Sequence, residues 1–492
     1  MNAPARRPVR DFVPNFVRRS VCRPAITSGR RFLVLPLVYV VFALAFAIAF
    51  AAGAHAAPVL MISIDGLKPE YITQADAHGM KLPYLRTLLA KGTYADGVVG
   101  IWPTITYPSH TTLITGVWPA EHGIENNQVF DPEQRFRGAW NWYAAEIRVP
   151  TLWQVAHRAG LRTASVGWPV SAGATDVDYL IPEYWRSASP SDSANPDDQL
   201  LMAALARPDS LLQQLKPAAG PYMNGNDTSI AGDEMKTRYA LEILRRYKPA
   251  FMTLHLSSLD ESQHTHGPFS PEACADLEAL DGMVARLAHQ VFVGNPSAVL
   301  VIVSDHGFMN ISHAVNLVIP FLQAGFIQGG MDPATKSPVV SSWKAQPWMA
   351  GGMAAIMLHD PNDHATEQQV KGMLDGLAAN PDNGIAEILD RDAMKKRGAY
   401  PDAAFLVVLK PGYYTANGLS GSLVTPIPGN RGSHGFSPEY PEMRSSFFAV
   451  GAGIARHRDL GLVDMRQIAP TVAGILHVPM PTAKATPLNV YP

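Results

Sequence analysis

Short apolar runs that each lead to an acidic residue recur along the chain. Such runs are typical of buried parallel strands, and the carboxyl ends of parallel strands are where α/β sheets place ligands. Stretches with helical spacing of apolar residues alternate with them. The runs are Pro58–Ile64 before Asp65, Ala250–Asp260, and Ala298–Ser304 before Asp305; the helical stretches are Leu82–Gly92, Val149–Gly160, Asp233–Tyr247 and 270–290. This alternation predicts an α/β fold with a mainly parallel central sheet and helices on both faces.

Two segments interrupt the alternation. Residues 171–232 are rich in proline, serine, aspartate and glycine, with one helical island around 199–206. Residues 314–429 hold a predicted helix near Leu317–Ala324 and a predicted strand at Met353–Leu358. We interpret both segments as irregular excursions from one domain that spans residues 57–492.

The N-terminus has a different composition from the rest of the chain. Residues 1–31 contain eight arginines and one acid, Asp11, and Phe32–Ala54 is almost wholly apolar. With the small-residue pattern at 54–56, this predicts an export signal at residues 1–56 that is cut after about Ala56. An uncleaved signal anchor stays open as the alternative, because the apolar run is just long enough to span a bilayer. In either case we expect the folded part outside the cytoplasm, in the periplasm or secreted.

The overall composition is that of a large globular protein. The chain has 492 residues, 47% of them hydrophobic and 17% charged. Without residues 1–56, eight of the 40 basic and one of the 42 acidic residues are gone, so the formal net charge changes from −2 to −9. This charge argues against a nucleic-acid polymer as partner. Cys22 lies in the predicted signal and Cys274 is then alone, so we expect no internal disulfide in the mature chain.

The stretch PTITYPSHTTLITG at 103–116 places a threonine at the expected start of a helix. Pro108 suits a first helical turn, and Gly116 can end the helix. The hydroxyl of Thr106 would point out of a helix N-terminus, where free backbone N–H groups and the helix dipole favour anions. A threonine needs a base or a metal to act as a nucleophile, and the alternative is that Thr106 is only an N-cap residue.

Six residues at predicted strand or loop ends are of types that bind metals. Oxygen and imidazole ligands, three per metal with room for substrate, are typical of catalytic zinc, whereas structural zinc is usually enclosed by cysteines. Each has a structural alternative, such as a turn cap or a surface ion pair. Their expected position at one edge of the sheet favours a metal centre. They are Asp65, Asp260, His264, Asp305, His306 and His434.

The ordered motifs resemble those of the nucleotide pyrophosphatase/phosphodiesterase family of the alkaline phosphatase superfamily. They are SIDG at 63–66, PTITYPSH at 103–110 followed by TGVWPAEHGI, DESQH at 260–264 followed by THGP, SDHGF at 304–308 and GSHGF at 432–436. The similarity covers about Pro58–Leu476. The resemblance implies an alkaline phosphatase-like three-layer sandwich. It also implies metal-dependent hydrolysis of phosphodiester or pyrophosphate bonds in nucleotide-type or related small diesters.

The resemblance further implies two zinc ions and a threonine nucleophile. Thr106 would bridge to the second ion and form a phosphothreonine intermediate, while both cations stabilise the entering and leaving oxygens. The expected partner is a small-molecule diester or pyrophosphate, and a membrane only if the apolar N-terminus is retained. The implied ligands are Asp260, His264 and His434 for one ion and Asp65, Asp305 and His306 for the other.

Three residues near the implied site need separate interpretation. Ser109 stands where the family has an asparagine that donates to a nonbridging phosphate oxygen, so we expect a weaker donor there. His255 stands where nucleotide-cleaving members tend to carry a tyrosine that stacks on the base, which leaves the nucleotide preference open. His266 does not occupy a ligand position of the motif, and we interpret it as a neighbour of the site.

Several other functions stay open as alternatives. A phosphomonoesterase or a phosphonoacetate-type hydrolase could use the same scaffold, although a monoesterase normally needs an extra cation and the sequence shows none beside Thr106. An envelope phosphoethanolamine transferase usually has several membrane spans, and this chain has one candidate. A sulfatase is unlike this sequence, because Thr106-Tyr107-Pro108 lacks the cysteine or serine that is modified in those enzymes.

Overall fold

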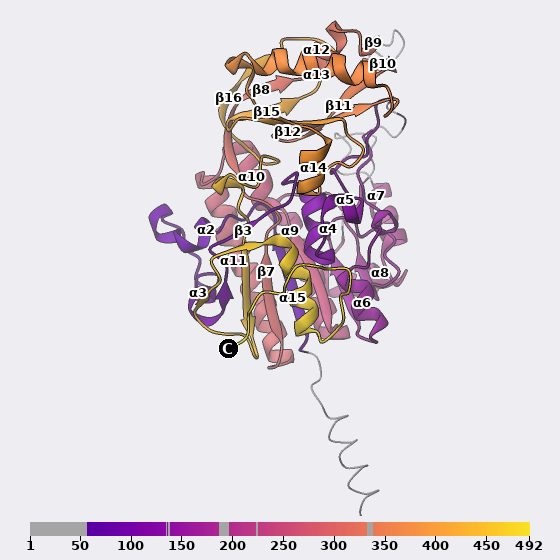
Figure 1. Ribbon diagram of the computed structural model, residues 1–492. Helices are drawn as coiled ribbons and strands as arrows, with labels where there is room; N and C mark the ends of the chain where they lie inside the picture. Colours follow the sequence, from indigo (N-terminus) through magenta and orange to yellow (C-terminus); the bar gives the residue numbers. More distant parts are fainter. Residues whose placement is uncertain (1–56, 134, 136–137, 186–195, 223–224, 332–337) are drawn as a thin grey trace, which may run out of the picture. The chain divides into compact units, whose positions relative to one another are not determined.

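The computed structural model describes residues 57–492 except 134, 136–137, 186–195, 223–224 and 332–337 (Figure 1). The predicted signal at 1–56 lies outside the described residues. Within the described part, no helix combines the length and the apolar character that are needed to cross a membrane.

A mainly parallel sheet of eight strands forms the centre of the fold, as the sequence predicts. β1 lies between β6 and β7 and is parallel to both, while β17 runs antiparallel to β7 at the other side of that strand. Every residue of β1, β6 and β7 is buried. The strands, in order across the sheet, are β18 (Arg458–Asp459), β2 (Thr93–Tyr94), β17 (Phe447–Gly451), β7 (Val299–Val303), β1 (Val59–Ile64), β6 (Phe251–Leu256), β4 (Thr163–Val166) and β5 (Tyr179–Ile181).

Helices cover both faces of this sheet because both faces are apolar. Leu60, Ile62 and Ile64 of β1 pack into one hydrophobic core with residues of α9 (Ile230–Tyr247) and α11 (Pro271–Gly294). Val59 and Met61 pack into a second core. That core includes residues of α4 (Thr106–Thr115), α6 (Leu152–Arg158) and α15 (Ile468–Ile475). Successive residues of β1 therefore pack against helices on opposite faces of the sheet. The predicted α/β class with helices on both faces is confirmed.

Further helices and one small strand pair complete this part of the fold. They are α2 (Glu70–Thr73), α3 (Thr87–Lys91), α5 (Pro119–His122), α7 (Pro196–Leu205), α8 (Leu211–Ala219) and α10 (Ser258–His266), and the two-stranded pair β3 (Gly97–Val99) and β19 (Leu462–Asp464). The helical island expected around 199–206 corresponds to α7.

The segment 314–429 is more regular than the sequence suggests (orange in Figure 1). The helix expected near Leu317–Ala324 is present as α12 (Val318–Gln323), and the strand expected at Met353–Leu358 is β12. β12 belongs to a four-stranded antiparallel sheet with a hydrophobic core of its own. That sheet has the order β11 (Ala345–Ala350), β12, β14 (Phe405–Leu409), β13 (Ile385–Leu389).

Further elements complete this segment. They are α13 (His364–Ala378), α14 (Arg391–Arg397), the pair β9 (Ile327–Met331) and β10 (Pro338–Trp343), and the three-stranded sheet β15 (Tyr413–Ala416), β8 (Met309–Asn316), β16 (Val424–Ser433). β16 returns the chain to the central sheet and ends directly before His434.

Candidate metal centre and nucleophile

Three neighbouring strands deliver the candidate metal ligands to one edge of the central sheet. Asp65 follows β1, Asp305 and His306 follow β7, and α10 begins two residues after β6 and carries Asp260. Because β6, β1 and β7 are adjacent and parallel, their carboxyl ends lie side by side. The common edge that the sequence predicts for these residues is present in the structure.

One group of potential ligands consists of Asp260, His264 and His434, whose ligand atoms all lie within 4.8 Å of one another. The distance from Asp260 Oδ2 to His264 Nε2 is 3.4 Å, and that from Asp260 Oδ1 to His434 Nε2 is 3.7 Å. These are the three residues that the family resemblance assigns to one metal.

A second group surrounds the Nε2 atom of His306. This atom lies 3.3 Å from Asp65 Oδ1 and 3.1 Å from Asp305 Oδ2. Asp260 Oδ1 is 4.0 Å away, and Asp65, Asp260 and His306 also form a group within 4.8 Å. The structure therefore brings the expected set of Asp65, Asp305 and His306 together and places Asp260 beside both groups.

The buried carboxylates of this cluster fit bound cations. Asp65 Oδ1, Asp260 Oδ1 and Asp305 Oδ2 are buried and form no hydrogen bond with any described residue, although His306 lies close. Burial, followed by repulsion from neighbouring carboxylates, raises the pKa of Asp65 and Asp305 well above the usual aspartate value. Oxygen atoms without partners in such a site are those that a metal ion would satisfy.

The histidines present the nitrogen that a metal would need. In His264 and His434, Nδ1 lies 3.1 Å from the carbonyl oxygens of Gly432 and Thr104, respectively. A carbonyl can only accept a hydrogen bond, so Nδ1 carries the proton and the Nε2 lone pair is free for a metal. Burial lowers the pKa of His434 and His306 well below the usual value, which keeps both rings neutral.

Thr106 is the first residue of α4, directly beside these groups. The N-cap residue is Ile105, which makes no side-chain cap, so the interpretation of Thr106 as only an N-cap is wrong. Thr106 Oγ1 lies 3.5 Å from His306 Nε2. The helix ends where the sequence predicts, at Gly116, whose φ of 72° suits a glycine.

Two polar side chains near the first turn of α4, those of Ser109 and Asn127, differ in their hydrogen-bond partners. Ser109 is fully buried, and its Oγ has no hydrogen-bond partner among the described residues. Asn127 Oδ1 accepts the backbone N–H of Tyr107 at 2.8 Å, which holds the asparagine amide beside Thr106. The sequence motifs did not single out Asn127. The available signal was its place just after the TGVWPAEHGI motif.

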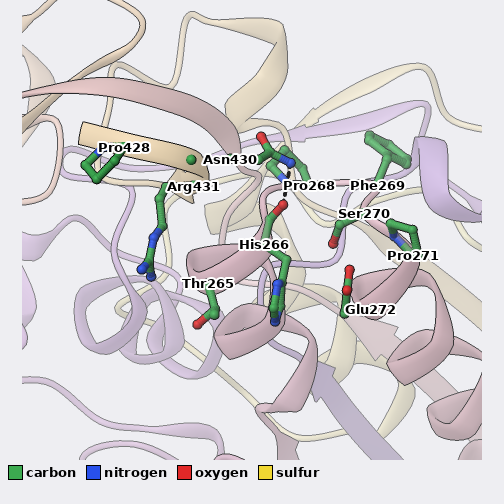
Figure 2. A pocket seen from close by; sticks show the side chains of 11 residues that line it. Thr265, His266, Pro268, Phe269, Ser270, Pro271, Glu272, Pro428, Asn430 and Arg431 are labelled. Atoms are coloured by element: carbon green, nitrogen blue, oxygen red, sulfur yellow. Dashed lines mark hydrogen bonds between the residues drawn. The ribbon is translucent and has the colours of Figure 1, made fainter. Parts of the chain in front are cut away.

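His255 and His266 have opposite environments. Both ring nitrogens of His255 face carboxylates, with Nε2 3.0 Å from Asp65 Oδ2 and Nδ1 2.9 Å from Glu183 Oε2. His266 is exposed and lines a surface pocket with Glu272 and Arg431, apart from both ligand groups (Figure 2).

A cavity opens from Thr106 and has a mixed aromatic and polar wall. Its rings come from Tyr107, Trp140 and Trp185, and it also contains Lys236, whose Nζ contacts Asp233 Oδ1 at 3.0 Å. The rings of Tyr107 and Trp140 pack edge to face with centroids 5.1 Å apart. The arrangement can receive an anionic group at Thr106 and a ring-shaped group against the aromatic wall.

Comparison with known proteins identifies relatives of the chain. Human ectonucleotide pyrophosphatase/phosphodiesterase family member 1 is 27% identical over 266 residues, which are 52% of this chain and 24% of that protein. Venom phosphodiesterase 2 of Crotalus adamanteus is 24% identical over 270 residues, 53% of this chain and 28% of that protein. The chain thus matches about a quarter of the length of these curated relatives.

Solved structures of related proteins share the fold. Murine ectonucleotide pyrophosphatase/phosphodiesterase 5 aligns over 88% of this chain and 97% of its own, with a TM-score of 0.60 and 18% identity. An inactive threonine-to-alanine variant of that murine protein, in complex with AMP, aligns with a TM-score of 0.59 and 17% identity over 88% of this chain and 97% of its own. Residues 59–437 match the family model described as Type I phosphodiesterase / nucleotide pyrophosphatase, and the chain therefore belongs to this family of hydrolases in the alkaline phosphatase superfamily.

Proposed function

We propose that the protein is a zinc-dependent enzyme that hydrolyses phosphodiester or pyrophosphate bonds in nucleotide-type substrates, with Thr106 as its nucleophile. The observation that carries this proposal is the position of Thr106 Oγ1 at the N-terminus of α4, 3.5 Å from His306 Nε2 and beside two groups of side chains that could hold metal ions. Family membership and the AMP complex of the murine relative support the nucleotide-type substrate.

Two zinc ions would be held by the two groups of side chains. Zinc in such a site supplies positive charge to a phosphate and lowers the pKa of an oxygen ligand. The proposed ligands are Asp260, His264 and His434 for one ion and Asp65, Asp305 and His306 for the other.

The protein's own groups would carry the chemical steps. The hydroxyl of Thr106 gives up its proton to water and its oxygen attacks phosphorus. The bond from phosphorus to the leaving oxygen breaks, the leaving group takes up a proton from water where its pKa requires one, and a phosphothreonine forms. Water then cleaves that ester and restores the threonine. Asn127, whose Oδ1 already accepts the N–H of Tyr107, would donate from its amide nitrogen to a nonbridging phosphate oxygen. Ser109 stays a second candidate donor, as the resemblance implies.

We further propose that the enzyme acts outside the cytoplasm, because residues 1–56 have the composition of an export signal. N-terminal sequencing of protein from the exported fraction should begin near residue 57. A sequence that began upstream of Phe32 would contradict cleavage and support the anchor.

A panel of four substrates, with zinc supplied, tests the reaction. The compounds are bis-p-nitrophenyl phosphate, p-nitrophenyl phosphate, thymidine 5′-p-nitrophenyl phosphate and a choline phosphodiester. We expect the two p-nitrophenyl diesters to be cleaved faster than the monoester, because a single nonbridging charge matches neutral donors such as Asn127. Faster cleavage of the monoester would replace this assignment with a phosphomonoesterase.

A further inference from the structure

We propose that His255 is a positioning residue that fixes the carboxylate of Asp65 for metal binding, and that it does not contact a substrate base. This inference rests on the proposed function, because it concerns the metal centre. It departs from the expectation for this position, where nucleotide-cleaving relatives tend to carry a stacking tyrosine.

The ring of His255 has no free edge. It belongs to β6 opposite Ser63 of β1 and is only 2% exposed. Nε2 lies 3.0 Å from Asp65 Oδ2, and Nδ1 lies 2.9 Å from Glu183 Oε2. The ring of His110 packs edge-on against it with centroids 4.5 Å apart. A base therefore finds no open face on His255, although the residue borders the cavity at Thr106.

The contact with Asp65 decides which carboxylate oxygen faces the metal position. Oδ2 is held by His255, whereas Oδ1 forms no hydrogen bond within the described part of the chain and lies 3.3 Å from His306 Nε2. A carboxylate that is fixed through one oxygen keeps the other in a constant direction. Partners of this kind orient metal ligands, and their loss typically weakens metal binding 10–100-fold.

Glu183 extends the contact to the nucleophile helix. Its Oε2 meets His255 Nδ1, and its Oε1 accepts the hydroxyl hydrogen of Tyr107 at 2.8 Å. Tyr107 directly follows Thr106 at the start of α4. Asp65, His255, Glu183 and Tyr107 thus form a buried chain of contacts, which we call the Asp65–Tyr107 chain. A tyrosine at position 255 could not replace it, because a single hydroxyl cannot reproduce two ring nitrogens that point in opposite directions.

Two variants of similar size separate hydrogen bonding from volume. His255→Leu fills the space without a polar atom, whereas His255→Gln can place an amide nitrogen near the position of Nε2. We expect metal-free His255→Leu to bind zinc about 10–100-fold more weakly than the wild type in competition with a chromophoric chelator. His255→Gln should recover part of this loss. His122→Gln is the matched control, because His122 is also fully buried but its Nε2 contacts Thr112 in α4 instead of a candidate ligand.

The zinc measurements decide the inference without reference to activity. Wild-type zinc affinity in His255→Leu, or equal losses in the leucine and glutamine variants, would overturn the positioning role. If His255→Leu does not fold, Glu183→Gln tests the same chain from its other side and should weaken zinc binding in the same direction. Unchanged zinc affinity in Glu183→Gln would then overturn the role.

Substrate selectivity provides the second readout. With zinc at saturation, the ratio of kcat/KM for thymidine 5′-p-nitrophenyl phosphate to that for bis-p-nitrophenyl phosphate should be the same in His255→Leu and in the wild type. A tenfold fall of this ratio would show that His255 contacts the base and would overturn the inference. If the wild type cleaves neither diester, the proposed function fails, whereas the zinc affinities still judge the role of His255.

Discussion

Thr106 presents a single hydroxyl at the place where two buried carboxylates, one half-buried carboxylate and two neutral imidazoles meet. We expect Thr106→Ala to lower kcat for bis-p-nitrophenyl phosphate by about 10³-fold or more, because no nucleophile remains. Zinc content and thermal unfolding should change little. Thr115→Ala is the control at the far end of α4, since its hydroxyl donates only to the carbonyl of Thr111. Wild-type turnover in Thr106→Ala would remove the nucleophile from the mechanism.

Asn127 and Ser109 compete for the role of the neutral phosphate donor. Asn127 is held beside Thr106 by its contact with the Tyr107 N–H, whereas Ser109 Oγ is enclosed without a partner among the described residues. We expect Asn127→Ala to lower kcat about 10²–10³-fold with a smaller change in KM. Ser109→Ala should lower kcat much less. The reverse order in steady-state kinetics would favour the donor that the family resemblance implies.

Single site residues were predictable where one short motif contains both a metal-binding residue type and the strand that places this residue at the sheet edge. Asp65 and Asp305 each follow an apolar run, so their place at the sheet edge follows from the strand pattern. Glu183 and Asn127 are not marked in this way. Glu183 follows only the three-residue strand β5, which is too short to stand out as an apolar run, and Asn127 lies in a loop whose path a local pattern does not contain.

At the scale of elements, the position of α10 depends on α9. Asp233 of α9 accepts backbone N–H groups of Ser257 and Ser258 at 2.8–3.0 Å, just before Asp260, and also contacts Lys236. Asp233→Ala would leave the Lys236 charge buried without its partner, and we expect a loss of about 3–5 kcal/mol in the free energy of unfolding.

Denaturant unfolding of purified variants measures this loss. Glu242→Ala is the control on the same helix, because its pairs with Arg245 and Arg246 lie at the surface and should contribute little. Equal stability of the two variants would mean that the buried pair does not hold α10 in place.

Helices and strands were predicted best where a run of apolar residues has clear ends in the sequence. β12 begins and ends at the expected residues, Met353 and Leu358, because a compact apolar run marks it. Its partners β11 and β14 were not expected. β11 alternates buried and half-buried residues and contains Pro347, and alternation alone does not say which strands pair.

At the scale of the whole molecule, the candidate metal centre joins elements from both halves of the chain. Its candidate ligands extend from Asp65 after β1 to His434 after β16, so bound metal would tie the central sheet to the return of the 314–429 segment. A ligand that binds only the folded state stabilises it by mass action, by about 4 kcal/mol per site at 1,000 times the dissociation constant.

Removal of zinc should therefore affect both activity and stability. We expect about two zinc ions per chain by elemental analysis and loss of diesterase activity after chelation. The unfolding temperature should fall by several degrees, because the buried carboxylates of Asp65 and Asp305 and the half-buried carboxylate of Asp260 then face one another without a cation. Re-addition of zinc should restore both properties, whereas magnesium should not, since it binds imidazole poorly.

Thr106→Ala should show the same fall in unfolding temperature on chelation, because it keeps every protein ligand except one oxygen. Full activity in metal-free protein would exclude a role for zinc in the reaction, and an unchanged unfolding temperature would exclude the metals as a link between these elements.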